Sequence, residues 1–275
     1  MSSHDCWSDT LDYYLLHSNE NSSYAHWFDS FITKPFGCLL SSRLNWFELG
    51  PGPGTKTAIL ANALLSINQS ALIRLMAIEP DNQWHESLKS TLAGVEGNGR
   101  FSFAISAGLQ GLDNSWPIGC GTMVTAFHVV YSHEATKSVL HYLDCLQGLP
   151  TPSLAIVSAE AKDSAFAEIR RRLRSSGIAA PQSHLDEVLD WSHSHHHQTQ
   201  VTKLVDQLCR IERDEVLADS NHWFIRFILG ISNVELQSMA EDTRELAHRI
   251  VSAYINDYPE SLLFVPDDVC EIHFS

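Results

Sequence analysis

The sequence FELGPGPGTKTAIL, from Phe47 to Leu60, decides the fold of this chain. Its first residues are apolar and are typical of the end of a buried strand, and its last residues favour a helix. The turn between them alternates glycine with proline: Gly50, Pro51, Gly52, Pro53 and Gly54. Glycine lets the backbone approach a ligand closely, and proline stiffens the turn. With Thr55 as a candidate helix cap, the stretch predicts a strand, a ligand-binding turn and a helix.

Three classes of ligand-binding turn are compatible with so much glycine. A phosphate-binding P-loop ends in Gly-Lys-Ser/Thr, whereas Gly54 is followed by Thr55 and then Lys56. A dinucleotide-binding loop has the spacing G-x-G-x-x-G, and here the third glycine comes one residue early. The remaining pattern, acid-x-G-x-G-x-G beginning at Glu48, resembles the first motif of class I S-adenosylmethionine-dependent methyltransferases.

A second apolar run, Leu72 to Asp81, has an acidic residue at its end. In a doubly wound sheet the carboxyl end of the second strand faces the ligand, and an acid there binds ribose hydroxyls. Glu79 fits this place, and Glu48 is a candidate to receive a ligand amino group or to orient the loop amides. Further alternation of strands and helices predicts an α/β fold with a mostly parallel sheet and helices on both faces.

The composition limits which ligands and partners the protein can bind. The 275 residues carry 18 basic and 33 acidic side chains, and the net charge of −15 disfavours nucleic acid and suits a small cationic substrate. No apolar run is long enough to span a membrane, and the first residues lack a secretory pattern. Six scattered cysteines without a Cys-x-x-Cys pair indicate reduced thiols. We therefore expect a cytoplasmic protein, and nothing in the sequence requires an oligomer.

The segments around the central motifs are assigned by hydrophobic period. Before the first strand, two helices are expected, separated by a break over residues 17–21 that contains Glu20. After Glu79 the expected elements are a helix over 82–92, strands over 100–105 and 122–131, a helix over 134–146, a strand over 153–158 and a helix over 164–175. Beyond these we expect helices over 184–191, 221–229 and 241–254, a strand over 199–211, and a final strand, Pro-Asp-Asp turn and strand over 261–275.

Histidines at two places in the sequence are candidates for ligand or metal binding. His128 follows a buried strand, where it is either a ligand contact or a hydrogen-bonded structural residue. His193, His195, His196 and His197 are crowded together, but no further ligand group accompanies them, and neighbours on a strand point to opposite faces. The sequence predicts a polar turn there and no metal site.

Taken in order, the chain resembles class I methyltransferases and, more narrowly, the histamine N-methyltransferase family. The likeness runs nearly end to end, on the motifs LLHSNE, FELGPGPGT, AIEPDNQ, AFHVVYSHEA, RDEVLADSNHWFIRFILG and LLFVPDD. It implies a seven-stranded Rossmann-like methyltransferase fold in a single domain over 1–275. The N-terminal helices (1–40) and insertions within 160–255 would contribute a substrate-binding cap.

The resemblance also assigns site residues and S-adenosylmethionine as the cofactor. Glu20 would hold the cationic amine of the substrate. The implied cofactor contacts are Glu48, Gly50, Gly52, Gly54, Glu79, Gln83, Ser106, Ala126 and Phe127. The implied substrate pocket includes Tyr131, and aromatic candidates to pack on a ring or an ammonium group are Trp7, Tyr14, Trp191, Trp223 and Phe224.

Two departures from the family fall on substrate recognition. Phe127 stands where the family has a glutamine, and the asparagine pair of the family's closing hairpin is replaced around Val265, Pro266 and Asp267. The cofactor class is therefore better supported than histamine as the substrate. The expected reaction is direct in-line methyl transfer to a small amine or imidazole, with proton loss to water, His128 or Tyr131. Methylation of an oxygen or carboxylate on the same fold, and cofactor binding without catalysis, are the alternatives; a nicotinamide oxidoreductase is disfavoured by the glycine spacing.

Overall fold

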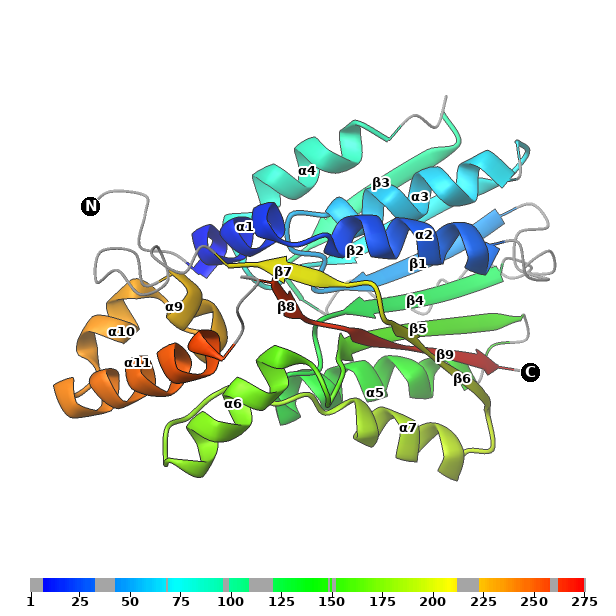
Figure 1. The fold of residues 1–275 in the computed structure, drawn as a ribbon. Helices are drawn as coiled ribbons and strands as arrows, with labels where there is room; N and C mark the ends of the chain where they lie inside the picture. Colours follow the sequence, from blue (N-terminus) through cyan, green and yellow to red (C-terminus); the bar gives the residue numbers. More distant parts are fainter. Residues whose placement is uncertain are drawn as a thin grey trace. The chain divides into compact units, whose positions relative to one another are not determined.

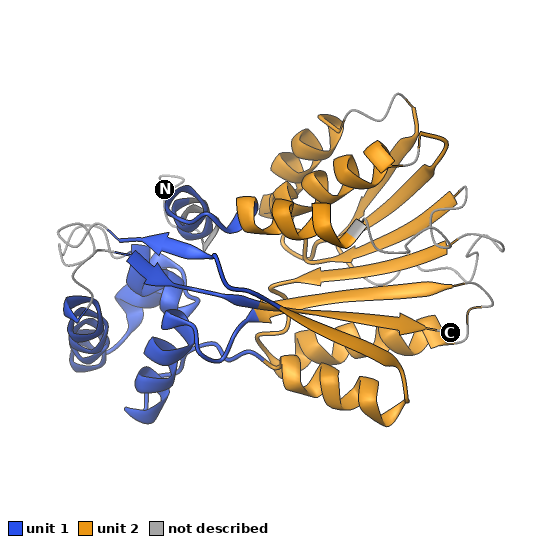
Figure 2. Ribbon diagram, turned by 45° about the vertical axis from the view of Figure 1, so that its right-hand side comes forward, with its two compact units in different colours: residues 1–21, 160–183, 203–267 blue, residues 22–159, 184–202, 268–275 orange. Residues whose placement is uncertain are grey.

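The computed structural model describes residues 7–32, 43–67, 69–95, 99–108, 121–147, 149, 152–211, 223–257 and 262–274. These form two compact units, coloured separately in Figure 2. One unit, called the sheet unit here, contains residues 22–159, 184–202 and 268–275. The other, called the helical unit, contains residues 1–21, 160–183 and 203–267. Each unit is thus assembled from three separate stretches of the chain.

A seven-stranded sheet in the order β3-β2-β1-β4-β5-β9-β6 runs through the described part of the sheet unit. Its strands are β1 (Arg43–Leu49), β2 (Leu72–Ile78), β3 (Phe101–Ser106), β4 (Gly121–Phe127), β5 (Ser153–Glu160), β6 (Gln198–Leu204) and β9 (Asp267–Phe274). The last residues of β5 and β6 and the first residue of β9 fall in the helical unit. The pairs β3–β2, β2–β1, β1–β4 and β4–β5 are parallel. This arrangement confirms the predicted fold class.

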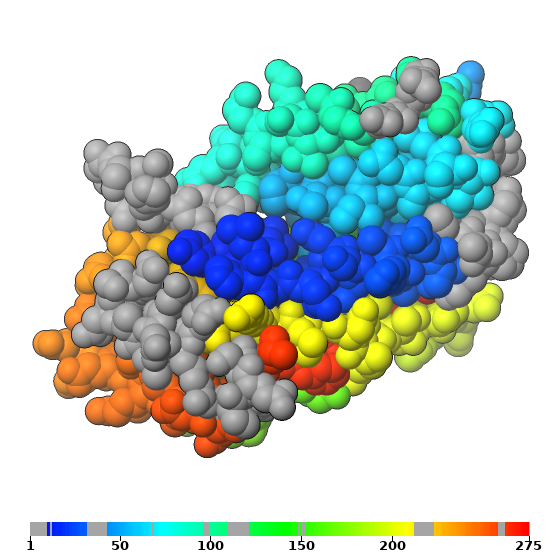
Figure 3. Space-filling model, turned by 45° about the horizontal axis from the view of Figure 1, so that its top comes forward, coloured from blue at the N-terminus to red at the C-terminus, as the bar shows by residue number. Residues whose placement is uncertain are grey.

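Burial explains why the central strands are mostly apolar. Every residue of β4 and β5 is buried, because helices cover both faces of a parallel sheet. Figure 1 shows α2, α3 and α4 on one face and α5 and α7 on the other. These helices are α2 (Glu20–Ile32), α3 (Thr55–Ile67), α4 (His85–Ala93), preceded by the 3₁₀ turn η2 (Asn82–Trp84), α5 (His133–Gln147) and α7 (Leu185–Ser194). The space-filling view shows the outer surface of α2 and α3 (Figure 3).

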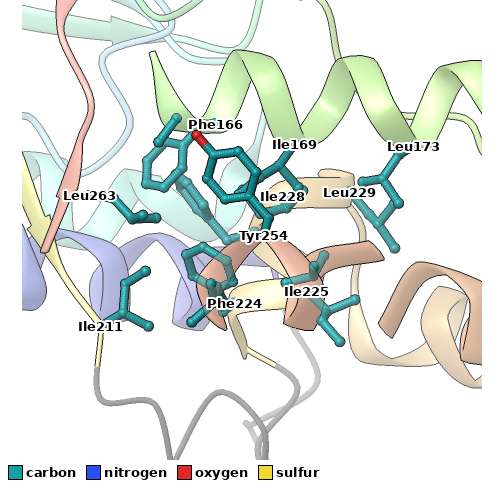
Figure 4. Close-up of a cluster of buried hydrophobic side chains, with 14 of the residues drawn as sticks. Phe166, Ile169, Leu173, Ile211, Phe224, Ile225, Ile228, Leu229, Tyr254 and Leu263 are labelled. Atoms are coloured by element: carbon teal, nitrogen blue, oxygen red, sulfur yellow. The ribbon is translucent and has the colours of Figure 1, made fainter. Parts of the chain in front are cut away.

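The helical unit has its own apolar core (Figure 4). Its helices are α1 (Trp7–His17), α6 (Ala165–Ser175), α9 (Trp223–Leu229), α10 (Asn233–Ser238) and α11 (Glu241–Asn256), and its small antiparallel sheet pairs β7 (Leu208–Arg210) with β8 (Leu262–Phe264). All residues of α9 are buried, and Phe166 of α6 and Tyr254 of α11 belong to the same core. A separate core of this kind lets the unit hold side chains in fixed positions.

Two predicted strand arrangements are wrong. The strand expected over 199–211 is broken into β6 and β7, with a turn at Val205 and Asp206. The two strands of the expected closing hairpin, β8 and β9, belong to different sheets. The short segment between them does not reverse the chain, because the Val265 amide donates to the Gln207 carbonyl (3.0 Å) while the Pro266 carbonyl accepts from the Ala161 amide (2.9 Å). The predicted Pro-Asp-Asp turn is therefore an extended crossing from one sheet to the other.

The break between the N-terminal helices is narrower than predicted. It consists of Ser18 and Asn19, and Glu20 is the first residue of α2. Asn19 pairs with the chain near β7: its amide side chain donates to the Asp206 carbonyl (2.8 Å) and accepts from the Leu208 amide (2.7 Å). Ser18 forms a β-bridge with Cys209. The start of α2 is therefore fixed by β7 within the helical unit.

No helix among the described residues is long and apolar enough to cross a membrane.

Candidate functional site

The glycine turn after β1 has the backbone conformation that its sequence requires. Gly50, Gly52 and Gly54 all have positive φ angles, of 61°, 56° and 80°. These angles favour glycine because a side chain there strains the backbone. A Cβ atom on Gly50 would lie 2.9 Å from a methyl of Val129, and one on Gly54 would lie 2.5 Å from a methyl of Leu88. At Gly52 a Cβ would meet nothing within 4 Å, so the middle of the turn is open.

Glu79, at the end of β2, is joined directly to this turn. One oxygen of its carboxylate accepts from the Gly52 amide (2.8 Å) and the other accepts from the Asp81 amide (2.9 Å). Burial raises the pKa of the Glu79 carboxyl, while the two amide hydrogen bonds act in the opposite direction. A carboxylate has about four acceptor positions, so each oxygen keeps capacity for a further hydroxyl donor. The turn and the acid therefore form one rigid unit at the carboxyl edge of the sheet.

Two further predicted cofactor residues lie beside Glu79. Ser106 is the last residue of β3, and its carbonyl accepts from the Glu79 amide (2.8 Å). The Ser106 hydroxyl donates to the Gly108 carbonyl (2.8 Å). Gln83 lies in η2 with its side chain exposed. Its backbone amide donates to the side chain of Asp81, which caps that turn. Asp81, not singled out from the sequence, thus links Glu79 to η2.

Glu48 is buried one residue before the end of β1. Burial raises the pKa of its carboxyl to about 8, against the opposing effects of Thr57, Lys56 and Thr125. One of its carboxylate oxygens finds no hydrogen-bond partner among the described residues. A buried acceptor left open in this way is costly, and a positively charged donor would relieve the cost.

The end of β4 differs from the sequence prediction. The strand stops at Phe127, not at Tyr131, because His128 adopts a left-handed conformation with φ 58°. The chain then turns back, and the Tyr131 hydroxyl lies 2.8 Å from Nδ1 of His128, with the two rings stacked. A non-glycine residue with positive φ is uncommon and often marks a functional position. The turn thus brings the His128 and Tyr131 side chains together.

Ala126 and Phe127 end β4 and are both buried. Phe127 packs edge-to-face against Tyr24 and Phe28 of α2, at ring-centroid distances of 5.4 and 5.8 Å. This packing accounts for an aromatic residue at the position where the resembled family has glutamine. The side chain of Phe127 contributes to the core beneath α2 in the sheet unit.

Trp191 lies far along α7 from the carboxyl edge of the sheet. The helix starts near that edge, where the His184 amide donates to the Val130 carbonyl (2.8 Å). Trp191 follows two turns later, donates to Asp144 (3.0 Å) and packs against Phe274. Phe274 ends β9, which runs in the direction opposite to the parallel strands (Figure 1). Within the sheet unit, Trp191 is therefore separated from Glu79 and the glycine turn.

The helical unit gathers a second set of polar side chains around Glu20. Glu20 and Asp267 are both buried, and their carboxylate oxygens lie within 4.8 Å of each other. Gln207 is fully buried and donates its side-chain amide to Asp267 (3.0 Å). The carbonyl oxygen of that amide finds no hydrogen-bond partner among the described residues. We call Glu20, Asp267 and Gln207 the acceptor cluster, since it combines two carboxylates with a buried carbonyl.

Neighbouring groups respond to these charges. The pKa of Tyr14 is raised well above its ordinary value, first by burial and then by Glu20 and Asp267. The pKa of the Cys209 thiol is raised to about 12 by burial and by Glu20. Tyr14 also stacks on Phe227 with ring centroids 4.4 Å apart, so it belongs to the core of the helical unit as well as to the cluster. No sequence motif marks Gln207 or Cys209 as site residues. Their place in the cluster is apparent only from the structure, where Gln207 bonds to Asp267 and Cys209 pairs with Ser18.

Trp223 belongs to an aromatic group on another face of α1. Its ring stacks on Tyr13 and on His17, each at 5.4 Å. Phe224 is buried in the core of the helical unit. The backbone of Trp7 starts α1, but its side chain lies outside the described residues, as do residues 221–222 of the helix predicted over 221–229.

No family model matches the chain, and no curated protein sequence matches it. Solved structures do match. A cyclopropane-fatty-acyl-phospholipid synthase-like protein from Lactobacillus casei ATCC 334 is 16% identical over 92% of each chain, with a TM-score of 0.52. Phosphoethanolamine N-methyltransferase 2 from Haemonchus contortus, solved with phosphomonomethylethanolamine and S-adenosylhomocysteine, is 10% identical, with a TM-score of 0.44, over 98% of this chain and 60% of that chain. The first likeness establishes the fold; the narrower resemblance to histamine N-methyltransferases stays a prediction.

Proposed function

We propose that the protein is an S-adenosylmethionine-dependent methyltransferase of a small amine. The observation that carries the cofactor assignment is the bond between the Gly52 amide and the Glu79 carboxylate. It joins an acid at the end of the second strand to an open glycine turn at the end of the first, which is the arrangement expected for a ribose and its attached chain.

The residues present fit this cofactor. Glu79 keeps acceptor capacity for ribose hydroxyls, and the open side of Gly52 leaves room for close approach. The buried, unpartnered oxygen of Glu48 suits a positively charged amino group. Ser106 and Gln83 are further polar residues that we assign to the cofactor. Ala126 and Phe127 lie at the carboxyl end of β4. When bound, the cofactor supplies a methyl group activated by a sulfonium; the protein has to align the acceptor and exclude water.

The acceptor cluster supports a cationic amine as substrate. An ammonium group has several N–H donors, and Glu20, Asp267 and Gln207 offer acceptors of matching number. Two carboxylates this close repel each other, so a cation between them relieves both the repulsion and the cost of burial. Tyr14, beside Glu20, is the aromatic surface that the helical unit offers to such a substrate, whereas Trp223 stacks on another face of α1.

His128 and Tyr131 are our candidates for the proton acceptor. A neutral imidazole accepts at one nitrogen only. If Nδ1 carries the proton and donates to the Tyr131 oxygen, Nε2 is the basic nitrogen; with the opposite tautomer, the Tyr131 hydroxyl donates to Nδ1, which is then occupied. The base role therefore requires Tyr131 to accept, and Tyr131→Phe should reduce kcat while leaving cofactor affinity unchanged.

The experiment measures S-adenosylhomocysteine release from the purified protein across small amines, imidazoles, polyamines, carboxylates and phenols. We expect release that depends on an amine and is lost in Glu20→Gln, with cofactor binding retained. Glu241→Gln, which changes an exposed acid at the start of α11, is the matched control and should behave as wild type.

Each other outcome is informative. Release with carboxylates or phenols alone would overturn the amine assignment and the role of Glu20 while keeping the cofactor. Cofactor binding with no turnover on any acceptor would favour a binding protein. A chain that fails to bind the cofactor at all would refute the interpretation of the glycine turn.

A further inference from the structure

We propose that His133, His184 and Glu187 bind a divalent transition-metal ion such as Zn²⁺ at the seam between α5 and α7 of the sheet unit. The three side chains come from the first residue of α5, the residue preceding α7, and the first turn of α7. Their candidate ligand atoms all lie within 4.8 Å of one another.

The distances suit a shared ion. Nδ1 of His133 lies 3.1 Å from Oε1 of Glu187, and Nδ1 of His184 lies 2.8 Å from the same oxygen. The ring centroids of the two histidines are 4.3 Å apart. Ligand atoms at about 2.0–2.1 Å from one Zn²⁺ are separated from each other by roughly 3 Å. Small rotations of these side chains would therefore place all three atoms on one ion.

Chemistry favours a borderline or soft divalent ion over Ca²⁺ or Mg²⁺. Imidazole nitrogens suit Zn²⁺, Ni²⁺ and Cu²⁺, whereas Ca²⁺ and Mg²⁺ prefer oxygen. The Glu187 carboxylate supplies the negative charge needed to offset the positive ends of two helix dipoles. The His133 side chain is 72% exposed and the His184 side chain 13%, so water can reach the ion and complete its coordination.

The ligands are held in place before any ion binds. Val139 and Leu143 of α5 share one core with Val188 and Leu189 of α7, which fixes the two helices together. The Glu187 amide donates to the His184 carbonyl (3.0 Å), so these two ligands keep a constant relation. Preorganisation of this kind lowers the cost of ordering flexible side chains on binding.

An ion here would stiffen the turn that carries the proposed proton acceptor. His133 directly follows the segment of His128 and Tyr131, and the His184 amide donates to the Val130 carbonyl (2.8 Å). Val129 of the same turn is the residue that packs against Gly50. The bound ion would thus stabilise the turn that follows β4 and would take no part in methyl transfer.

The same contacts have a simpler explanation, in which one carboxylate oxygen accepts from two imidazole N–H groups. A second histidine group in the sheet unit, which includes His195 and His197 with ring centroids 6.3 Å apart, is a competing place for an added ion. The test must separate both from the proposed site.

The experiment titrates chelator-treated full-length protein with Zn²⁺ by calorimetry at pH 7.5 and repeats the titration with Co²⁺, followed by visible absorption. We expect one ion to bind with micromolar or tighter affinity, and at least tenfold weaker binding in His133→Ala and in Glu187→Gln. The matched control, His195→Ala, should bind as wild type.

Amide hydrogen exchange supplies a readout independent of activity. Zn²⁺ should slow exchange over residues 130–136 in the wild type and in His195→Ala, and not in His133→Ala. No binding at micromolar Zn²⁺ would overturn the proposal, leaving the hydrogen-bonded triad. Binding that persists in His133→Ala and is lost in His195→Ala would also overturn it, by assigning the ion to the other histidines.

Discussion

Glu79 in the sheet unit and Asp267 in the helical unit are both buried acids, but they are held in different ways. Glu79 is held by backbone amides, those of Gly52 and Asp81. Asp267 is held by the side chain of Gln207, 60 residues away in the sequence. The first arrangement depends on the backbone path of one strand–turn–helix unit and its neighbour, and the second depends on which side chains the tertiary fold brings together.

The difference extends to the stability of the two units. The sheet unit is built on parallel ladders between consecutive central strands. The helical unit relies on buried side-chain polar contacts across its core, of which Glu160 with Arg170 is the most buried ion pair described. Substitutions of single side chains should therefore affect the helical unit more than the sheet unit, unless they touch the backbone of the glycine turn.

The largest effect is expected from Arg170→Met. The guanidinium of Arg170 pairs with Glu160 and donates to the carbonyls of Ile228 (3.0 Å) and Phe227 (3.2 Å). Removing it takes the charged donor away from the buried Glu160 carboxylate and one donor away from each of the two carbonyls, at a cost of about 3–5 kcal/mol. Chemical denaturation followed by tryptophan fluorescence would measure the loss, and Trp223 reports on the same unit.

Arg171→Met is the matched control for this prediction. Arg171 pairs with Glu168 on the outside of α6, where its side chain is 64% exposed. Exposed pairs contribute less than about 1 kcal/mol. Equal losses in the two variants would contradict the view that buried side-chain pairs hold the helical unit.

The next effect concerns pH and the sheet unit. The pKa of Glu48 is raised from 4.5 to about 8, so its folded carboxyl is protonated where the unfolded one is already ionised. The stability that the neutral form contributes is complete below pH 4.5 and is lost as the pH rises through 8. Glu48→Gln should therefore flatten the fall in unfolding free energy between pH 5 and pH 8, a fall of up to roughly 4 kcal/mol.

Glu168→Gln provides the contrast for Glu48. The pKa of Glu168 is lowered, chiefly by its hydrogen bond with Arg172, so its contribution is present at neutral pH and lost only in acid. Denaturation curves from pH 5 to pH 8 should keep the wild-type slope in this variant. A wild-type slope in Glu48→Gln as well would show that Glu48 is ionised throughout that range.

The sequence predicted the parts of the site whose geometry is local. Three glycines in one turn allow a backbone path that other residues adopt only with strain, and all three have positive φ angles in the structure. The carboxyl ends of neighbouring parallel strands lie at the same edge of the sheet. Glu79, at the end of the second strand, was therefore expected beside the glycine turn that follows the first. The alternation of strands and helices from β1 to β5 was likewise readable from the hydrophobic period, and the structure has it.

Long-range pairing escaped prediction. Nothing in the sequence near Gln207 indicates a partner at Asp267, and β8 was assigned to a hairpin because its partner β7 lies more than 50 residues earlier. The end of β4 was placed too late because hydrophobicity continues past His128 while its backbone turns. One local signal was missed: Ser232 and Glu235 form a capping box that starts α10.

A smaller effect is expected from Gly54→Ala. Its Cβ would come within 2.5 Å of Leu88, a buried residue of α4, and its φ of 80° adds backbone strain. We expect a loss of about 2–3 kcal/mol and weaker S-adenosylmethionine binding. In Gly52→Ala the strain remains but the space is open, so the stability loss should be nearer 1 kcal/mol. Equal stability losses would show that Leu88 moves aside and that the turn is looser than its contacts indicate.

The smallest effect is expected from Trp191→Phe, which tests whether the sheet unit supplies an aromatic side chain to the substrate. The substitution removes one exposed hydrogen bond to Asp144 and some packing on Phe274, a loss of about 1 kcal/mol or less. Because Trp191 lies far along α7 from Glu79 and the glycine turn, KM and kcat for an amine acceptor should stay at wild-type values. Tyr14→Leu in the helical unit should raise KM instead, since Tyr14 offers the aromatic surface that we assign to the substrate. A raised KM in Trp191→Phe, with wild-type kinetics in Tyr14→Leu, would contradict this assignment and place the aromatic contact in the sheet unit.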